Sequence, residues 1–166
     1  RELMELHTLG ADGGYAQGDV RELARILTGW TVDPDSESGF RFVPRLHDRG
    51  EKTLLGQRFG AEGESEGRAA IALLAGHPKT ARRVALRLAQ WFVSDAPPAA
   101  LVDRLAAEFR ASGGDLRAVM RVLVAADAFW DERQQLFKTP YDFACSVIAA
   151  TGRSEPERLQ QALRFL

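Results

Sequence analysis

Regularly spaced apolar residues constrain this chain most, because they recur with the period of an α-helix over most of its length. In residues 79–93 they are spaced three or four positions apart and fall on one helical face: Ala81, Val84, Ala85, Leu88, Trp91 and Phe92. Pro78 precedes them, in a first turn that needs no amide hydrogen from that residue. This pattern predicts a helix of about four turns with one buried face.

Glycine and proline divide the chain into further helical segments. The stretch SDAPP at 94–98 and the stretch SGGD at 112–115 each end one helix and begin another, with Asp115 as a good N-cap. The same spacing predicts helices at about 1–9, 17–29, 98–111, 116–124, 140–152 and 154–166. We therefore predict one mainly α-helical domain over residues 1–166, with six to seven helices in an orthogonal or bundle-like arrangement.

Residues 31–63 interrupt the helical pattern. Glycine is frequent there, and the stretch FRFVP (40–44) alternates apolar and polar residues as a short strand does. The stretch TLLGQRF (53–59) is its candidate partner, with HDRGEK (47–52) as the turn between them. The expectation is one small β-hairpin inserted at about 40–60.

Charge and cysteine content exclude several classes of protein. The 22 basic and 23 acidic residues nearly cancel, so no bulk field attracts nucleic acid or anionic membrane. We read the arginines at 82, 83 and 87 as a solvated helix face, because no aromatic residues interleave with them. No apolar run is long enough to span a membrane. Cys145 is the single cysteine, which excludes an internal disulfide, and its helical position predicts an inert core thiol beside Tyr141, Ala144 and Ile148.

Both termini are expected to be cut from a longer protein. The chain opens at Arg1 already in helical pattern, and it stops on an apolar periodic segment, RLQQALRFL. An export signal would then lie outside this sequence.

The stretch HDRGEK concentrates polar groups in an otherwise ordinary sequence, and a phosphate-binding loop is the first reading to test. That motif requires G-x-x-x-x-G-K-[ST] leading directly into a helix. Glu51 separates Gly50 from Lys52, and a strand is expected to follow. The stretch is not a phosphate loop, and no cofactor is predicted.

Metal binding and acid–base chemistry remain open alternatives. Distant residues can assemble a metal site, for which His7, His47, Asp48 and Glu22 are the candidates, although no H-E-x-x-H pattern is present. His47 beside Asp48 is also suited to general base catalysis, but no G-x-S-x-G nucleophile elbow accompanies it.

A purely structural role for the same stretch is equally concrete. Asp48 accepts backbone amides two residues on, and Gly50 adopts a positive φ. Lys52 is then solvated, while His47 hydrogen-bonds locally or to the first helix. His7, four positions from Leu3, is expected to be half-buried against the core.

Four long stretches together resemble the bacterial family known as domain of unknown function 1800. They are RELMELHTLGADGGYAQGDVRELARILTGWTV, FRFVPRLHDRGEKTLLG, GHPKTARRVALRLAQWFVSDAPP and SGGDLRAVMRVLVAADAFW, in order over nearly the whole chain. The resemblance implies an exported, extracytoplasmic protein that is longer than this chain and is often encoded beside a sulfatase-like protein. It implies no activity and no catalytic residues.

One position departs from that family. Ala16 stands where the family usually has threonine or serine, at the expected N-cap of a helix with Asp19 three residues on. Alanine lacks the side-chain acceptor, so this helix start is expected to be weaker by about 1 kcal/mol.

Two functions from different classes are compatible with these observations. The preferred one is a non-catalytic scaffold or partner-binding module of an exported bacterial protein, with a protein partner and no nucleic acid. The alternative is a metal-assisted or acid–base hydrolase, with its site between the hairpin and the first two helices. Its candidate catalytic residues are His7, His47, Asp48, Lys52 and Glu22. Convergence of His7, His47 and Asp48 in one cleft would favour the enzyme.

Overall fold

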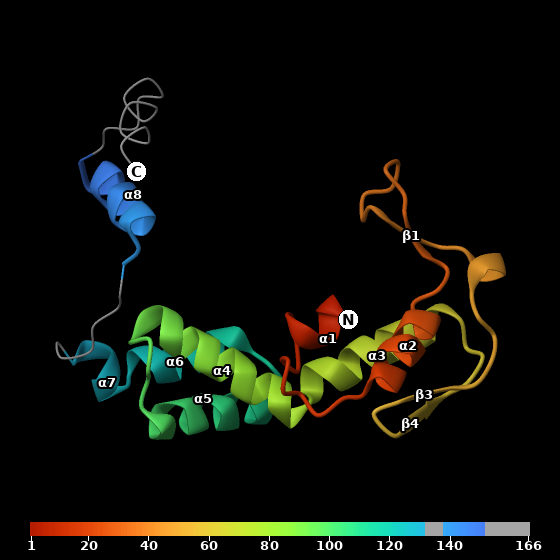
Figure 1. The fold of residues 1–166 in the computed structure, drawn as a ribbon, viewed down its shortest axis with the longest axis horizontal. Helices are drawn as coiled ribbons and strands as arrows, with labels where there is room; N and C mark the ends of the chain where they lie inside the picture. The colour runs from red at the N-terminus through yellow and green to blue at the C-terminus, as the bar shows by residue number, and fades with distance from the viewer. Residues whose placement is uncertain (132–137, 152–166) are drawn as a thin grey trace.

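The computed structural model describes residues 1–131 and 138–151, which form a mainly α-helical protein (Figure 1). The helices of this part are α1 (Glu2–Glu5), α2 (Gln17–Ile26), α3 (Glu64–Gly76), α4 (Pro78–Phe92), α5 (Ala99–Ala111), α6 (Leu116–Val124), α7 (Asp127–Trp130) and α8 (Pro140–Thr151). The predicted fold class, mainly α with a small β insertion, is confirmed. The helix expected over 154–166 lies outside the described residues. No helix in the described part has the length and apolar character needed to cross a membrane.

The helix starts follow the predicted capping chemistry. Asp115 accepts a hydrogen bond from the backbone amide of Arg117 at 2.8 Å and so caps α6. At the start of α4, the ring Nδ1 of His77 accepts from the amide of Lys79 at 3.1 Å, and Pro78 occupies the first turn. His77 is therefore the N-cap of α4.

The β structure consists of two short hairpins. Strand β1 (Trp30–Val32) pairs antiparallel with β2 (Phe40–Phe42), and β3 (Lys52–Leu54) pairs antiparallel with β4 (Gln57–Phe59). The expected pairing of FRFVP with TLLGQRF is wrong, because each strand closes on its nearer neighbour. Leu55 and Gly56, at φ 50° and 80°, form a two-residue hairpin loop that joins β3 directly to β4. The stretch HDRGEK is a connector between the hairpins, entered through a 3₁₀ turn at Pro44–Leu46.

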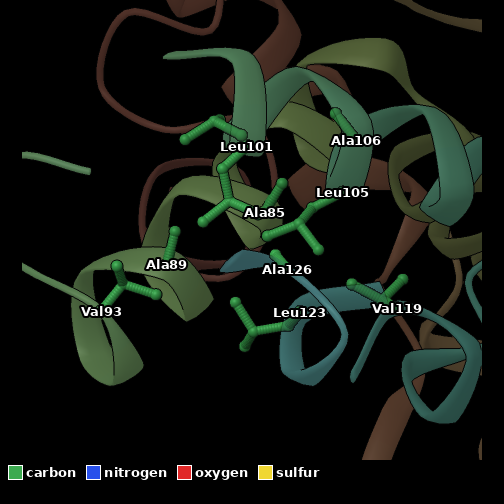
Figure 2. Close-up of a cluster of buried hydrophobic side chains, with 10 residues drawn as sticks. Ala85, Ala89, Val93, Leu101, Leu105, Ala106, Val119, Leu123 and Ala126 are labelled. Carbon is green, nitrogen blue, oxygen red and sulfur yellow. The ribbon is translucent and has the colours of Figure 1, made fainter. Parts of the chain in front are cut away.

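Two apolar clusters form the core. One lies between α4, α5 and α6, where alanines of α4 allow α5 to approach closely (Figure 2). The other lies between α1, α2, α3 and the second hairpin. Its eight buried residues are Met4, Leu9, Leu23, Ile26, Leu54, Phe59, Ala70 and Leu74. This second cluster positions the polar site.

Helix α8 stands apart from the other helices (Figure 1). Tyr141 and Cys145 are exposed, so the expectation of an inert core thiol is wrong. Helical periodicity identifies the apolar face of a helix, but it does not show whether another element covers that face.

Candidate functional site

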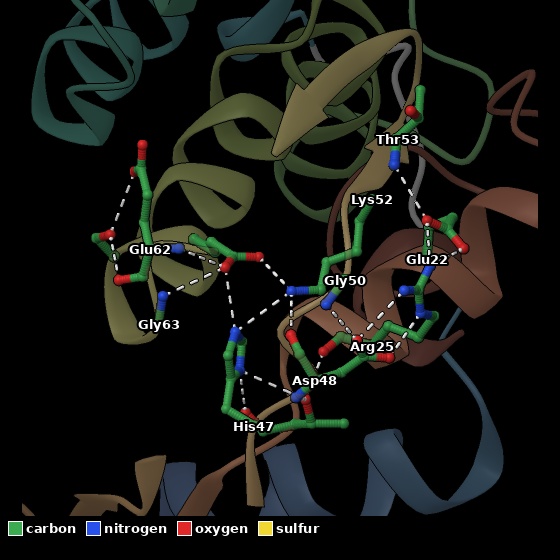
Figure 3. Close-up of polar contacts among 12 residues, drawn as sticks. Glu22, Arg25, His47, Asp48, Gly50, Lys52, Thr53, Glu62 and Gly63 are labelled. Atoms are coloured by element: carbon green, nitrogen blue, oxygen red, sulfur yellow. Dashed lines mark hydrogen bonds and ion pairs between the residues drawn. The ribbon is translucent and has the colours of Figure 1, made fainter. Parts of the chain in front are cut away.

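A buried polar cluster joins the connector between the hairpins to α3 (Figure 3). The ammonium of Lys52 lies 2.7 Å from Oε2 of Glu66, and Nε2 of His47 lies 3.1 Å from Oε1 of the same carboxylate. Lys52 Nζ is also 3.3 Å from His47 Nε2, and it donates to the backbone carbonyl of Asp48. The three side chains are 0–3% exposed. The structure thus brings together two of the predicted residues, His47 and Lys52, around a carboxylate that was not predicted.

Glu66 is the acceptor at the centre of this cluster. It occupies the third position of α3, where its Oε1 also accepts the backbone amides of Glu62 at 2.8 Å and Gly63 at 3.2 Å. Burial raises the pKa of Glu66, but hydrogen bonds from Lys52 and then His47 outweigh it, so the pKa lies below its usual value. The carboxylate is therefore held ionised inside the protein.

The ring of His47 is fixed on both sides. Its Nδ1 lies 2.8 Å from the carbonyl oxygen of Thr28, which can only accept, so Nδ1 carries a hydrogen. Nε2 faces both Lys52 and Glu66. A neutral ring accepts there from the ammonium, and a protonated ring donates to the carboxylate. Phe42 packs edge-on against the ring at a centroid distance of 5.5 Å and covers it.

Asp48 faces away from His47 and toward α2. Its carboxylate receives Arg25 Nε at 2.8 Å and Nη2 at 3.3 Å, together with the amide of Gly50 at 2.8 Å. The Arg25 hydrogen bond, followed by the Gly50 amide, lowers the pKa of Asp48 to about 2. The expected capping of its own turn by Asp48 is confirmed.

Gly50 serves this turn by its size. Its φ is not positive, contrary to the expectation, but a Cβ there would lie 2.7 Å from Nη2 of Arg25. The glycine therefore leaves room for the guanidinium that pairs with Asp48.

Glu22 completes a chain of charges along α2. Its two carboxylate oxygens accept Arg25 Nη1 at 2.9 and 3.0 Å, and Oε2 also accepts the amide of Thr53 at 3.0 Å. The hydrogen bond from Arg25, and then that from Thr53, lowers the pKa of Glu22. Glu22 therefore fastens strand β3 to α2 and contacts neither His47 nor Lys52.

His7 does not join these residues. The short helix α1 buries Met4 and ends at Glu5, and the turn that follows buries Leu9 but leaves Leu6 and His7 exposed. The expectation of a half-buried His7 is therefore wrong. His7, His47 and Asp48 do not converge in one cleft, and the structure separates the residues proposed for a hydrolase into three environments.

Sequence reasoning placed Lys52 in solvent and overlooked Glu66, Thr28 and Arg25. A signal for Glu66 does exist: it precedes the buried Ala70 by four positions and the buried Leu74 by eight. A carboxylate in line with an apolar helical face is a candidate for a buried, paired charge.

The cluster of His47, Lys52 and Glu66 has the properties of a buried structural contact rather than of an exposed reactive centre. Lys52, His47 and Glu66 satisfy one another and nearby backbone groups, and solvent does not reach their side chains. Within residues 1–131 and 138–151, no three His, Cys, Asp or Glu side chains are grouped so that they could hold a metal ion. In this conformation the cluster holds the connector against α3.

An open groove lies elsewhere, along α4 and the turn after α1. Its volume is about 970 Å³, and it is lined by Leu6, His7, Arg83, Val84, Arg87, Leu88, Gln90, Trp91, Phe92 and Asp95. Trp91 is 77% exposed and follows Arg87 by one helical turn. The sequence pattern placed Trp91 on the buried face of this helix, and that expectation is wrong because the side chain lies at the open groove.

The fold and the site together define a mainly α-helical module with a sealed polar cluster and an open cationic groove. Residues 1–166 match the model of the family described as protein of unknown function DUF1800, and the chain belongs to that family. No curated protein and no solved structure matches it. The resemblance drawn from the four quoted stretches is thereby confirmed.

Proposed function

We propose that this chain is a non-catalytic helical module of an exported bacterial protein and binds a partner protein through the groove along α4. The groove carries this proposal: it combines exposed apolar surface at Leu6, Trp91 and Phe92 with the cations Arg83 and Arg87. Large exposed aromatic residues and arginines are the residue types enriched in protein interfaces.

The contrast between the two polar regions supports a binding role. A hydrolase needs its acid–base groups within hydrogen-bond reach of a substrate. The His47 side chain is 3% exposed and already contacts Thr28, Lys52 and Glu66. His7 is exposed but belongs to the groove, so the groups named for catalysis share no common space.

The export part of the proposal rests on the family. Fractionation of the producing bacterium is expected to place the full-length protein outside the cytoplasm. Recovery of the protein solely in the cytoplasmic fraction would contradict it.

Site-specific photo-crosslinking in the producing bacterium tests the binding role. A photo-reactive phenylalanine analogue replaces Trp91 in the full-length protein, and the matched control carries it in place of Val32, which is 71% exposed on β1. We expect a discrete adduct with one protein from position 91 and not from position 32. Identical patterns from the two positions, or no adduct from position 91, would overturn the proposal.

A further inference from the structure

We propose that the groove along α4 recognises an acidic helical segment of the partner, with two carboxylates one turn apart and a large apolar side chain one turn further on. This inference rests on the proposed binding function and specifies the chemistry of the occupant. We call such a segment the acidic helix.

Arg83 and Arg87 provide the cationic half of the groove. They lie four residues apart on α4, a rise of about 6 Å. Arg83 Nη2 donates to the carbonyl of Leu6 at 3.1 Å, and Arg87 Nη1 donates to Oε1 of Gln90 at 3.2 Å. Within the described residues neither forms an ion pair with a carboxylate, and each guanidinium has further N–H donors.

Some other arginines already contact carboxylates. Arg82, the neighbour of Arg83 on α4, bonds to Asp103 of α5, and Arg25 bonds to Glu22 and Asp48. Arg83 and Arg87 instead keep N–H donors for an added carboxylate. Planar, bidentate binding of carboxylates is the interaction that arginine makes best.

Trp91 provides the apolar end. It follows Arg87 by four residues, so Arg83, Arg87 and Trp91 form one stripe about 12 Å long on α4. Phe92 and Leu6 extend the apolar surface beside it and are 41% and 54% exposed. A helix parallel to α4 that carries acids at i and i+4 and an apolar residue at i+8 repeats this spacing.

Nucleic acid is the competing occupant, because cations and a tryptophan can also bind phosphates and bases. The charge balance favours the peptide. The formal net charge of the chain is −1, so the chain offers no bulk attraction to a dense polyanion, whereas a helix with two carboxylates needs only the two arginines.

Fluorescence anisotropy with synthetic peptides tests this recognition. The probe is a fluorescein-labelled helical peptide with Glu at i and i+4 and Leu at i+8, and the reference peptide has Lys in place of both Glu residues. We expect the full chain to bind the acidic peptide at least about tenfold more tightly than the lysine peptide, with affinity falling as salt rises. Equal binding of the two peptides would overturn the inference, as would complete displacement of the acidic peptide by an equimolar thymidine 20-mer.

Charge reversal on the protein supplies the matched control. Arg87→Glu is chosen because Arg83 also holds the Leu6 carbonyl and its loss would disturb α1. We expect Arg87→Glu to lower the affinity for the acidic peptide about tenfold and to raise the affinity for the lysine peptide. Arg104→Glu, at an exposed position of α5, should leave both affinities unchanged. Equal effects of the two variants would contradict recognition by the groove.

The peptide and crosslinking results separate the two proposals. An adduct at position 91 without a preference for the acidic peptide refutes the acidic helix and leaves the binding function supported. A preference for the acidic peptide without any adduct supports the chemistry of the groove and refutes the binding function in the producing bacterium.

Discussion

The ammonium of Lys52 lies 2.7 Å from the carboxylate of Glu66, and the two side chains are among the least exposed in the protein. This contact joins strand β3 to α3 across a part of the chain that sequence patterns assign to a solvated turn. Burying two charges carries a large desolvation cost, which is offset only when both are hydrogen-bonded. Here the Glu66 carboxylate contacts Lys52, His47 and two backbone amides, and the Lys52 ammonium contacts three groups.

Removal of Lys52 is expected to destabilise the protein strongly. Lys52→Met leaves the Glu66 carboxylate buried without its cation, which costs about 3–5 kcal/mol of the free energy of unfolding. Urea denaturation measures this change in the free energy of unfolding. Lys79→Met, at an exposed position of α4, is the control and should change stability by less than about 0.5 kcal/mol. Equal stability of the two variants would refute the buried pair.

Asp48 is expected to make the protein acid-sensitive. Its pKa is about 2 in the folded state against an ordinary value of 3.8, so below pH about 4 the unfolded state binds more protons than the folded state. The stabilisation is present above the higher value and is lost as the pH falls toward 2. Asp48→Asn should make the free energy of unfolding depend less on pH in this window. The control Asp12→Asn, at an exposed position, should leave that pH dependence unchanged. Parallel pH profiles for the wild type and Asp48→Asn would contradict the Arg25 pairing.

Gly67 is expected to tolerate no side chain. A Cβ at this position of α3 would lie 2.3 Å from Cζ2 of Trp30, so Gly67→Ala forces the indole away at a cost of about 1–3 kcal/mol. Gly18→Ala on α2 meets no atom within 4 Å and should instead stabilise the protein by about 0.5 kcal/mol. Thermal denaturation of the two variants should therefore shift Tm in opposite directions. Shifts of the same sign would show that Trp30 does not pack on α3.

The start of α2 is expected to be improvable. Ala16 is its N-cap, with φ −99° and ψ 168°, and its amide donates to Asp19 at 2.8 Å, but alanine offers no acceptor in return. Ala16→Ser supplies that acceptor and should stabilise the protein by about 1 kcal/mol. The same substitution at Ala24, at an exposed position inside α2, should be slightly destabilising. Chemical denaturation compares them, and no gain from Ala16→Ser would argue against this helix start.

Local patterns predicted the helical part of the fold well. Periodicity and capping residues located α4, α5 and α6 to within one or two residues, because the apolar spacing of an amphipathic helix is visible in its local sequence. Strand pairing was harder. Three-residue strands carry little periodicity, and the loop at Leu55 and Gly56 decided which strands meet.

The site was predicted only in part. His47 and Lys52 attracted attention by their chemistry, but their partner Glu66 follows 14 positions after Lys52 in an acidic stretch that resembles an ordinary helix start. Burial of a lysine depends on which carboxylate the fold brings to it, and that is a tertiary contact. The position of His7 is likewise a tertiary property, since the turn after α1 places it in the groove, apart from His47.

The side chain of His47 is closed to solvent, whereas the groove that contains His7 is open, and chemical modification of the histidines distinguishes the two environments. The chain contains three histidines, so diethylpyrocarbonate labelling followed by mass spectrometry can follow each one separately. In the folded protein, His7 should react rapidly, and His47 should react only at the rate of unfolding. Modification of His47 as fast as His7 would show instead that the cluster of His47, Lys52 and Glu66 is open to solvent.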